Sequence, residues 1–257
     1  MALPSGWLGQ ADNFLGIDEP WCHPDQAGVY VLPAPYEHTS SYILGSDRGP
    51  SAIIEASQQV ELYDETLRYE PYREWGGVAT AATLNLDGRV DGPAVQAIQD
   101  FVQPHVGRGK FLVTLTGEHT GALGAIRAHA RNYPGMCVVQ IDAHGDLRQA
   151  YQDNPYSHAS VMARVVEDGL PLVQIGVRSI SPEEIDLIQK TPRIHTFFAA
   201  SILDPSGPYE GRAARWIPQV LAACTGPVYL TFDCDGLDAS LVPALGTPEP
   251  GGLGWYD

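Results

Sequence analysis

Aspartate and histidine residues follow the end of one strongly apolar stretch of this sequence. The segment VVQID runs directly into AHGD, which places Asp142, His144 and Asp146 at a spacing of two residues. Because an extended backbone alternates its two faces, residues at this spacing are expected to point the same way. Three groups that can bind cations would then converge on one point.

Two further apolar stretches end in the same kinds of residue. The segment VYLTFDCD ends with Asp233 and Asp235, and FLVTLT leads into GEH, which contains His119. Packed carboxylates repel one another, and buried charges are costly without a partner, so protons or cations must lie among them. Oxygen and imidazole ligands without thiolates suit Mn²⁺, with Zn²⁺, Ni²⁺ or Fe²⁺ as weaker alternatives. The three apolar ends together predict a metal site.

The stretches that lead to these residues are short and apolar, which is typical of strands buried on both faces. We expect strands at 29–35, 77–86, 110–116, 136–142, 171–177, 194–200 and 227–234. Helices are expected after Gly49-Pro50, from Asp91 and over 211–223, and Ser181 to Glu184 resembles a capping box with proline at the first helical position. Strands that alternate with helices predict an α/β fold, a three-layer sandwich with a mainly parallel sheet. Its site is expected at the carboxyl ends of the strands.

The composition restricts the class of function. The net charge of −16 disfavours nucleic acid, because phosphate binding needs a basic face, and it suits metal ions or a cationic small substrate. No apolar stretch reaches the ~18 residues of a membrane helix, and the N-terminus lacks the pattern of a secretory signal. The four cysteines form no CxxC pair and are interpreted as reduced thiols. We therefore expect a cytoplasmic protein that binds neither nucleic acid nor a membrane.

Five motifs make the sequence similar to the arginase/agmatinase (ureohydrolase) family. They are GEHT at 117–120, DAHGD at 142–146, NPYSHASVM at 154–162, FDCDGLD at 232–238 and GTPEPGGL at 246–253. The third and the fifth look particularly like the agmatinase branch. The resemblance extends from about residue 28 to the end of the chain and implies one ureohydrolase domain over 1–257.

The resemblance implies a cofactor of two Mn²⁺ per chain. One ion would be held by His119, Asp142, Asp146 and Asp233. The second would be held by the group of four that consists of Asp142, His144, Asp233 and Asp235, so that Asp142 and Asp233 bridge the pair.

The resemblance also implies three catalytic roles. Asp146 would accept a proton and pass it to the departing amine, and His158 would shuttle protons near neutral pH. Glu249 would hold a guanidinium group through a charge-assisted pair. Two structural alternatives stay open, because Glu249 could be a turn residue between prolines and His158 could cap the following helix. Asp238 is expected to be structural or to support the ligands.

The implied reaction is hydrolysis of a small cationic guanidino compound to urea and an amine. Agmatine, which would give putrescine, fits the motifs and the acidic composition, and this places the enzyme in polyamine biosynthesis. Other ureohydrolase activities stay open, namely guanidinobutyrase, guanidinopropionase, arginase and formiminoglutamase, as does a non-catalytic metal-binding pseudoenzyme. Family precedent implies a homo-oligomer, either a trimer or a hexamer.

Two departures from the family pattern are visible. The first motif reads TGEH where many members have GGDH, and Glu118 is expected to change only the surroundings of the ligand. The chain also stops at Asp257, whereas family members continue through another helix, a strand and a closing helix. We therefore expect a domain truncated at its C-terminus that lacks the last strand and helix. The missing strand would lie beside the strands that end before His119 and Asp233.

Overall fold

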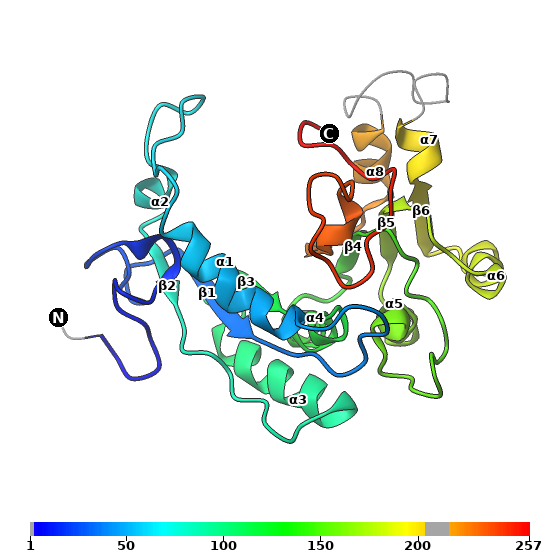
Figure 1. Cartoon of the computed structure of the whole chain (residues 1–257), viewed down its shortest axis with the longest axis horizontal. Helices are drawn as coiled ribbons and strands as arrows, with labels where there is room; N and C mark the ends of the chain where they lie inside the picture. The colour runs from blue at the N-terminus through cyan, green and yellow to red at the C-terminus, as the bar shows by residue number, and fades with distance from the viewer. Residues whose placement is uncertain (1–2, 204–215) are drawn as a thin grey trace. The chain divides into compact units, whose positions relative to one another are not determined.

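The structure is a computed structural model, and it describes residues 3–203 and 216–257 (Figure 1). The chain divides into two compact units, each with its own hydrogen-bonded sheet among the described residues. The first unit is Met1–His38 with Gly45–Ala128, and the second is Thr39–Leu44 with His129–Asp257. The expectation of one domain over 1–257 stays a prediction.

The first unit contains a parallel sheet in the order β2-β1-β3. Its strands are β1 (Val29–Ala34), β2 (Val78–Thr80) and β3 (Phe111–Thr116). Helix α1 (Gly49–Ser57) packs against β1 and β3. The remaining helices that begin in this unit are α2 (Pro71–Glu74), α3 (Asp91–Val102), α4 (Thr120–Asn132) and the 3-10 turns η1 (Phe14–Gly16), η2 (Ser46–Arg48) and η3 (Gln103–His105).

The second unit contains a parallel sheet in the order β6-β5-β4-β7. Its strands are β4 (Cys137–Ile141), β5 (Leu172–Val177), β6 (Ile194–Phe198) and β7 (Val228–Phe232). All of β5 and nearly all of β4 is buried, so both faces of these strands are covered. The helices are α5 (Val161–Glu167), α6 (Pro182–Lys190), α7 (Ala199–Leu203) and α8 (Ile217–Ala223), with 3-10 turns η4 (His158–Ser160) and η5 (Cys234–Gly236).

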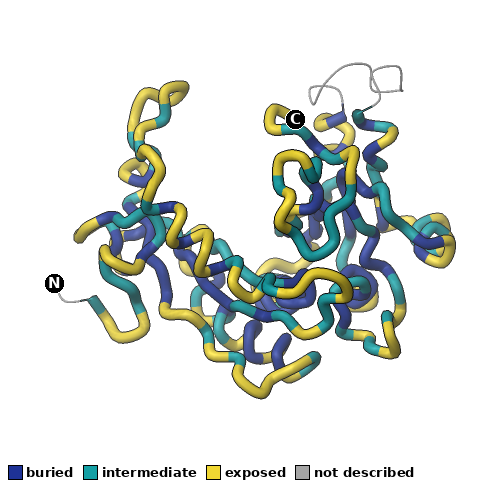
Figure 2. Tube along the Cα trace, viewed as in Figure 1, coloured by how far each residue is buried: buried dark blue, intermediate teal, exposed yellow. Residues whose placement is uncertain are grey.

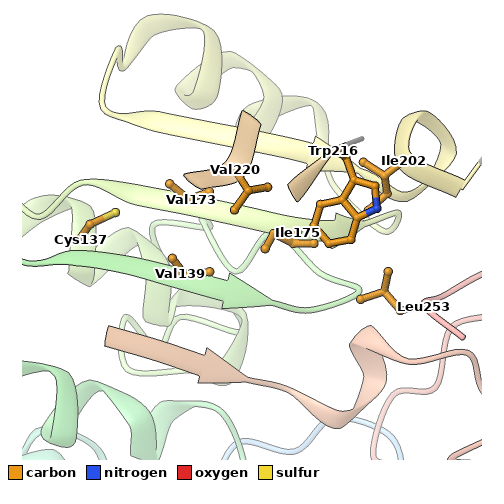
Figure 3. Close-up of a cluster of buried hydrophobic side chains, with 8 residues drawn as sticks. All are labelled: Cys137, Val139, Val173, Ile175, Ile202, Trp216, Val220 and Leu253. Atoms are coloured by element: carbon orange, nitrogen blue, oxygen red, sulfur yellow. The ribbon is translucent and has the colours of Figure 1, made fainter. Parts of the chain in front are cut away.

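A cluster of apolar side chains covers one face of the second sheet (Figure 3). Alternate residues of β4 and β5, among them Val139 and Ile175, pack there against two residues of the α8 region. Trp216 is the residue that caps the start of α8, and Val220 lies within the helix. Each fully buried aliphatic side chain contributes about 1.5–3 kcal/mol to folding. The same alternation directs the intervening residues of β4 and β5 to the opposite face, and Figure 2 shows both strands buried.

The predicted strands are all present, and most of their bounds agree within one or two residues. The exception is β2, which was expected over 77–86. Its ladder with β1 ends at Thr80, and the next residue, Ala81, makes an isolated antiparallel bridge with Trp7. The capping box of α6 is confirmed, since Ser181 and Glu184 make both reciprocal hydrogen bonds. Part of the helix expected over 211–223 lies outside the described residues, and α8 accounts for the remainder.

Strands β3 and β7 lie at sheet edges within the described ranges 3–203 and 216–257. The side chains of β7 are correspondingly exposed, at 53% for Val228, 55% for Leu230 and 48% for Phe232. Burial on both faces therefore does not extend to this strand among the described residues. The strand expected beside β3 and β7 stays a prediction. No helix in the described part of the chain is long and apolar enough to cross a membrane.

Candidate metal centre

The loop after β4 brings a buried carboxylate and an imidazole together. Strand β4 ends at Ile141, and the carboxylate of Asp142, which is 1% exposed, accepts a hydrogen bond of 2.6 Å from the N–H of His144. His144 extends the sheet by one isolated bridge to Ser179. Asp146 then has a φ of 52°, in the left-handed region. Extended alternation therefore explains Asp142 and His144, but it was the wrong explanation for Asp146.

The turn after β7 places the second pair of aspartates. Asp233 caps η5, because its Oδ1 accepts a hydrogen bond of 3.0 Å from the N–H of Asp235. The Oδ1 of Asp235 accepts a hydrogen bond of 3.0 Å from the N–H of Ala143 and so joins this turn to the loop after β4. Gly236 lies so close to Ile141 that a Cβ would come within 2.8 Å of its Cγ2. The pair is thus placed by a 3-10 turn and not by strand alternation.

Asp142, His144 and Asp235 form a compact group of potential ligands in the second unit. One ligand atom from each lies within 4.8 Å of the others. The Nδ1 of His144 is 3.0 Å from Oδ2 of Asp235 and 3.5 Å from Oδ1 of Asp142. On the other side of the ring, Nε2 is 3.9 Å from Oε1 of Glu249. Three carboxylates, which attract a cation, and one imidazole, which can carry a positive charge, therefore meet at this point.

The electrostatics of the group favour a cation. Burial by itself lowers the pKa of His144, but hydrogen bonds to Asp142 and Asp235, with the charges of Asp235 and Asp146, raise the pKa to about 11. Burial also raises the pKa of the Asp235 carboxyl, and the charge of Asp142 adds to this effect, whereas the hydrogen bond from His144 opposes it. A proton on His144 supplies the positive charge that these carboxylates require. A divalent cation would supply it more fully.

A pocket of about 230 Å³ opens beside this group within the second unit. Its lining includes His144, Asp146, His158, Tyr151 and Ser41, together with Arg148, Glu184, Thr247 and four neighbouring residues. The pocket is polar in character, and two of the three predicted catalytic residues line it. A larger cavity of about 840 Å³ in the first unit is lined almost wholly by apolar side chains and lacks such a group.

His158 is held at the pocket by its own backbone and ring. Its N–H donates to Oγ1 of Thr39 at 2.9 Å, and the same oxygen is 3.1 Å from its Nδ1. The ring of Tyr151 meets the imidazole edge to face at 5.9 Å. The cap of η4 is provided by Ser157, whose Oγ accepts a hydrogen bond from the N–H of Ala159. The helix-capping alternative for His158 is therefore wrong.

Sequence reasoning missed Arg178, which ties the segments of the centre together. Its guanidinium donates hydrogen bonds to five backbone carbonyls at 2.6–3.2 Å, those of Gly176, Asp235, Leu237, Glu249 and Pro250, and a longer one of 3.5 Å to the carbonyl of Gly236. The turn after β7 and the loop that carries Glu249 are thereby fixed to the end of β5. The only signal in the sequence is an arginine directly after the apolar strand LVQIGV.

Asp238 supports the same loop from its other end. Its Oδ2 accepts hydrogen bonds from the N–H groups of Gly251 at 2.7 Å and Gly252 at 3.3 Å. Hydrogen bonds from the hydroxyl and N–H of Ser240, and from the N–H of Gly251, hold the pKa of Asp238 below its usual range. These local contacts agree with the structural role expected for Asp238.

Comparison with known proteins gives a clear family. The model of the arginase family matches residues 27–257. The chain is 43% identical over 263 residues to N(1)-aminopropylagmatine ureohydrolase of Synechocystis sp., which covers all of this chain and 82% of that protein. The corresponding protein of Thermus thermophilus is 33% identical over 231 residues, 90% of this chain and 75% of its own length. The chain belongs to the arginase family.

Solved structures of the family agree with this assignment. The agmatine ureohydrolase of Thermoplasma volcanium matches with a TM-score of 0.74 and 29% identity, over 89% of this chain and 74% of its own. The predicted family, α/β fold class and hydrolase activity are thereby confirmed. Members of the arginase family use a binuclear metal site, and the group formed by Asp142, His144 and Asp235 is suited to part of one.

The family motif GEHT lies in the first unit, directly after β3. His119 is buried and immediately precedes α4. The neighbouring Glu118 is also buried, and its Oε2 accepts a hydrogen bond of 2.9 Å from the N–H of His38. Glu118 thus holds the backbone of His38, the last residue of the first unit before the segment Thr39–Leu44. The membership of His119 in a common metal site with the second unit stays a prediction.

Proposed function

We propose that this chain hydrolyses the guanidino group of an agmatine-type compound and releases urea and an amine. The observation that carries the proposal is the cluster of Asp142, His144 and Asp235 with the carboxylate of Glu249 at its edge. A guanidinium group is planar and cationic, so a partly exposed carboxylate beside a metal site suits its recognition. Glu249 has 38% of its side chain exposed, which leaves it accessible to a ligand.

N(1)-aminopropylagmatine is the proposed substrate, with agmatine as the second choice. The motifs alone favoured agmatine, and N(1)-aminopropylagmatine contains the same guanidino group on the same carbon chain. Four relatives that are 32–43% identical bear the name N(1)-aminopropylagmatine ureohydrolase, whereas three relatives named agmatinase are 29–30% identical. Hydrolysis of N(1)-aminopropylagmatine by one water would release urea and leave the corresponding triamine.

The residues present fit two Mn²⁺ ions. The described group offers carboxylate oxygens and an imidazole without a thiolate, which suits manganese. We assign Asp142, His144, Asp233 and Asp235 to one ion. His119 completes the set around the other ion, with Asp142, Asp146 and Asp233, and this role rests on its motif. When bound, such a pair supplies Lewis acidity that lowers the pKa of a water from 15.7 toward about 7.

The protein side chains would then move protons and hold the substrate. Asp146 lines the pocket beside His144 and would accept the proton that the attacking water loses. His158, fixed by Thr39, would carry a proton between the pocket and solvent. Glu249 would orient the guanidinium, with its backbone held by Arg178. Attack of the water on the guanidinium carbon and release of the protonated amine complete the reaction.

The test is a substrate panel on purified protein loaded with manganese. N(1)-aminopropylagmatine, agmatine, arginine, guanidinobutyrate, guanidinopropionate and formiminoglutamate are compared by kcat/KM, with urea and formamide both detected. We expect N(1)-aminopropylagmatine to give the highest value and Glu249→Gln to lose most of it. A folded, manganese-loaded protein that turned over none of these compounds would support the pseudoenzyme alternative instead.

A further inference from the structure

A row of polar residues crosses the second sheet, whose strands are largely apolar. Thr196 of β6 is in register with Gln174 of β5, and Gln174 with Gln140 of β4. Thr231 of β7 continues the row. Both glutamine side chains are fully buried, at 0% exposure. They lie on the face opposite the apolar cluster of Figure 3, because they alternate with its members along β4 and β5.

The hydrogen bonds of this row have one direction. Thr196 Oγ1 donates to Gln174 Oε1 at 2.8 Å, and Gln174 Nε2 donates to Gln140 Oε1 at 2.6 Å. Gln140 Nε2 then donates to Oδ2 of Asp142 at 2.7 Å. An ionised carboxylate only accepts hydrogen bonds, so Asp142 requires the nitrogen of Gln140 and thereby fixes the sense of both amides. The row is therefore a chain of donors that ends on a proposed metal ligand.

The same two amides also hold the backbone of the loop after β4. Gln174 Nε2 donates to the carbonyl of Gly145 at 2.7 Å, and Gln140 Nε2 approaches the carbonyl of His144 at 3.4 Å. The loop leaves the extended conformation here, since the next residue, Asp146, has a φ of 52°. The glutamines thus restrain both the carboxylate that begins the loop and the peptide groups that precede its last aspartate.

Two buried amides are an unusual choice for strands covered on both faces, where valine or isoleucine would pack without any polar group to satisfy. Their presence is explained if they are needed at Asp142. The other oxygen of that carboxylate already accepts the N–H of His144 at 2.6 Å. With a donor on each of its two oxygens, the carboxylate plane is fixed and the remaining lone pairs point in set directions.

We propose that Gln140 and Gln174 are positioning residues that preset Asp142 and the 142–146 loop for metal binding. Neither contacts the ion or the substrate. The proposal deepens the proposed function, because it rests on Asp142 being a metal ligand. Hydrogen-bond partners behind a ligand typically contribute 10–100-fold in metal affinity.

The test measures the affinity for Mn²⁺ alone, by titration calorimetry, together with melting temperature. Gln140→Met and Gln174→Met keep the side-chain length and remove the hydrogen bonds. We expect each to weaken Mn²⁺ binding by about 10–100-fold. The two losses should combine to less than their product in the double variant, because both act through one chain of hydrogen bonds. Val173→Ala is the matched control, since it lowers stability from the opposite face of β5.

Thr196→Val provides a milder variant should either glutamine variant fail to fold. It removes only the first donor of the row and should weaken Mn²⁺ binding by a smaller factor. Affinities within twofold of the unaltered chain in the glutamine variants would overturn the proposal, and so would an equal loss in Val173→Ala. An unaltered chain that binds Mn²⁺ but hydrolyses no guanidine would refute the proposed function and leave this inference intact. A chain that binds no Mn²⁺ would refute both.

Discussion

Replacement of Arg178 by lysine should detach the loop that carries Glu249 from the rest of the centre. The guanidinium donates to five carbonyl groups that belong to three separate segments, at 2.6–3.2 Å. Lysine keeps the charge but offers three donors from a single point, and it cannot reproduce the planar fork. At least two of the five carbonyls would therefore lose their partner.

The magnitude follows from the number of bonds lost. A hydrogen bond to a charged group contributes about 1.5–3 kcal/mol, and the partial exposure of Arg178 favours the low end, so two lost bonds correspond to about 3 kcal/mol. Part of this loss should appear as local opening of residues 247–253. Because the carbonyl of Glu249 is one of the acceptors, its carboxylate would no longer be held 3.9 Å from His144. We expect KM for the preferred substrate to rise about tenfold, equivalent to about 1.4 kcal/mol.

Three measurements check the prediction: chemical denaturation, amide hydrogen exchange of residues 247–253, and steady-state kinetics. Arg193→Lys is the control, because the described contact of that guanidinium is a single carbonyl, that of Val166, at 2.8 Å. Arg178→Lys should be clearly more destabilising than this control and should accelerate exchange in the loop. Unchanged loop exchange and an unchanged KM would refute the idea that Arg178 positions Glu249.

Three further predictions concern the metal centre and its protons. Asp233→Ala should remove both Mn²⁺ ions, whereas His119→Ala should mainly weaken one; elemental analysis after desalting checks this, and full occupancy in Asp233→Ala would disprove the ligand assignment. His158→Ala should reduce kcat by about 10²–10⁴-fold with little change in Mn²⁺ affinity; unchanged turnover across pH would exclude a proton-transfer role. In the metal-free protein the pKa of His144 is about 11, against ~6.5 when unfolded, so its charged form contributes stability that is fully present below pH 6.5 and is lost as pH rises toward 11. Mn²⁺ must displace that proton, so its affinity should rise by about tenfold per pH unit between pH 7 and 8, as calorimetry can test; His144→Asn should remove the slope, and a flat profile in the unaltered chain would contradict the reasoning.

The sequence predicted every strand other than the end of β2 well, because each of these is a short apolar run with clear ends. Burial on both faces of β4 and β5 leaves little room for polar residues, so the runs are nearly continuous. The residues that follow them, such as Asp142 and His144, were recognisable because buried carboxylates at strand ends demand a cation. The family motifs then supplied the roles that spacing alone could not.

The remainder depended on contacts that are remote in the sequence. Asp146 and Asp235 reach the centre through a left-handed residue and a 3-10 turn, and neither conformation follows from a spacing of two. Arg178 acts through backbone carbonyls up to 72 positions away, whose presence no side-chain pattern records. The glutamines at 140 and 174 were visible as interruptions of apolar strands, but their purpose required the register of β4 on β5.

The segment Thr39–Leu44 lies in the sequence between the two parts of the first unit but packs with the second unit. Thr39 accepts the N–H of His158 across 119 positions, and the N–H of Ile43 donates to the carbonyl of Gly246 at 3.3 Å. A fragment that began at residue 129 would therefore lack the partner of His158 and the Ser41 side of the pocket. During synthesis these six residues are made long before their partners His158 and Gly246, so their native contacts can form only late. Contacts of such high sequence separation slow folding. A split or circularly permuted version of the enzyme would have to carry them with its C-terminal half.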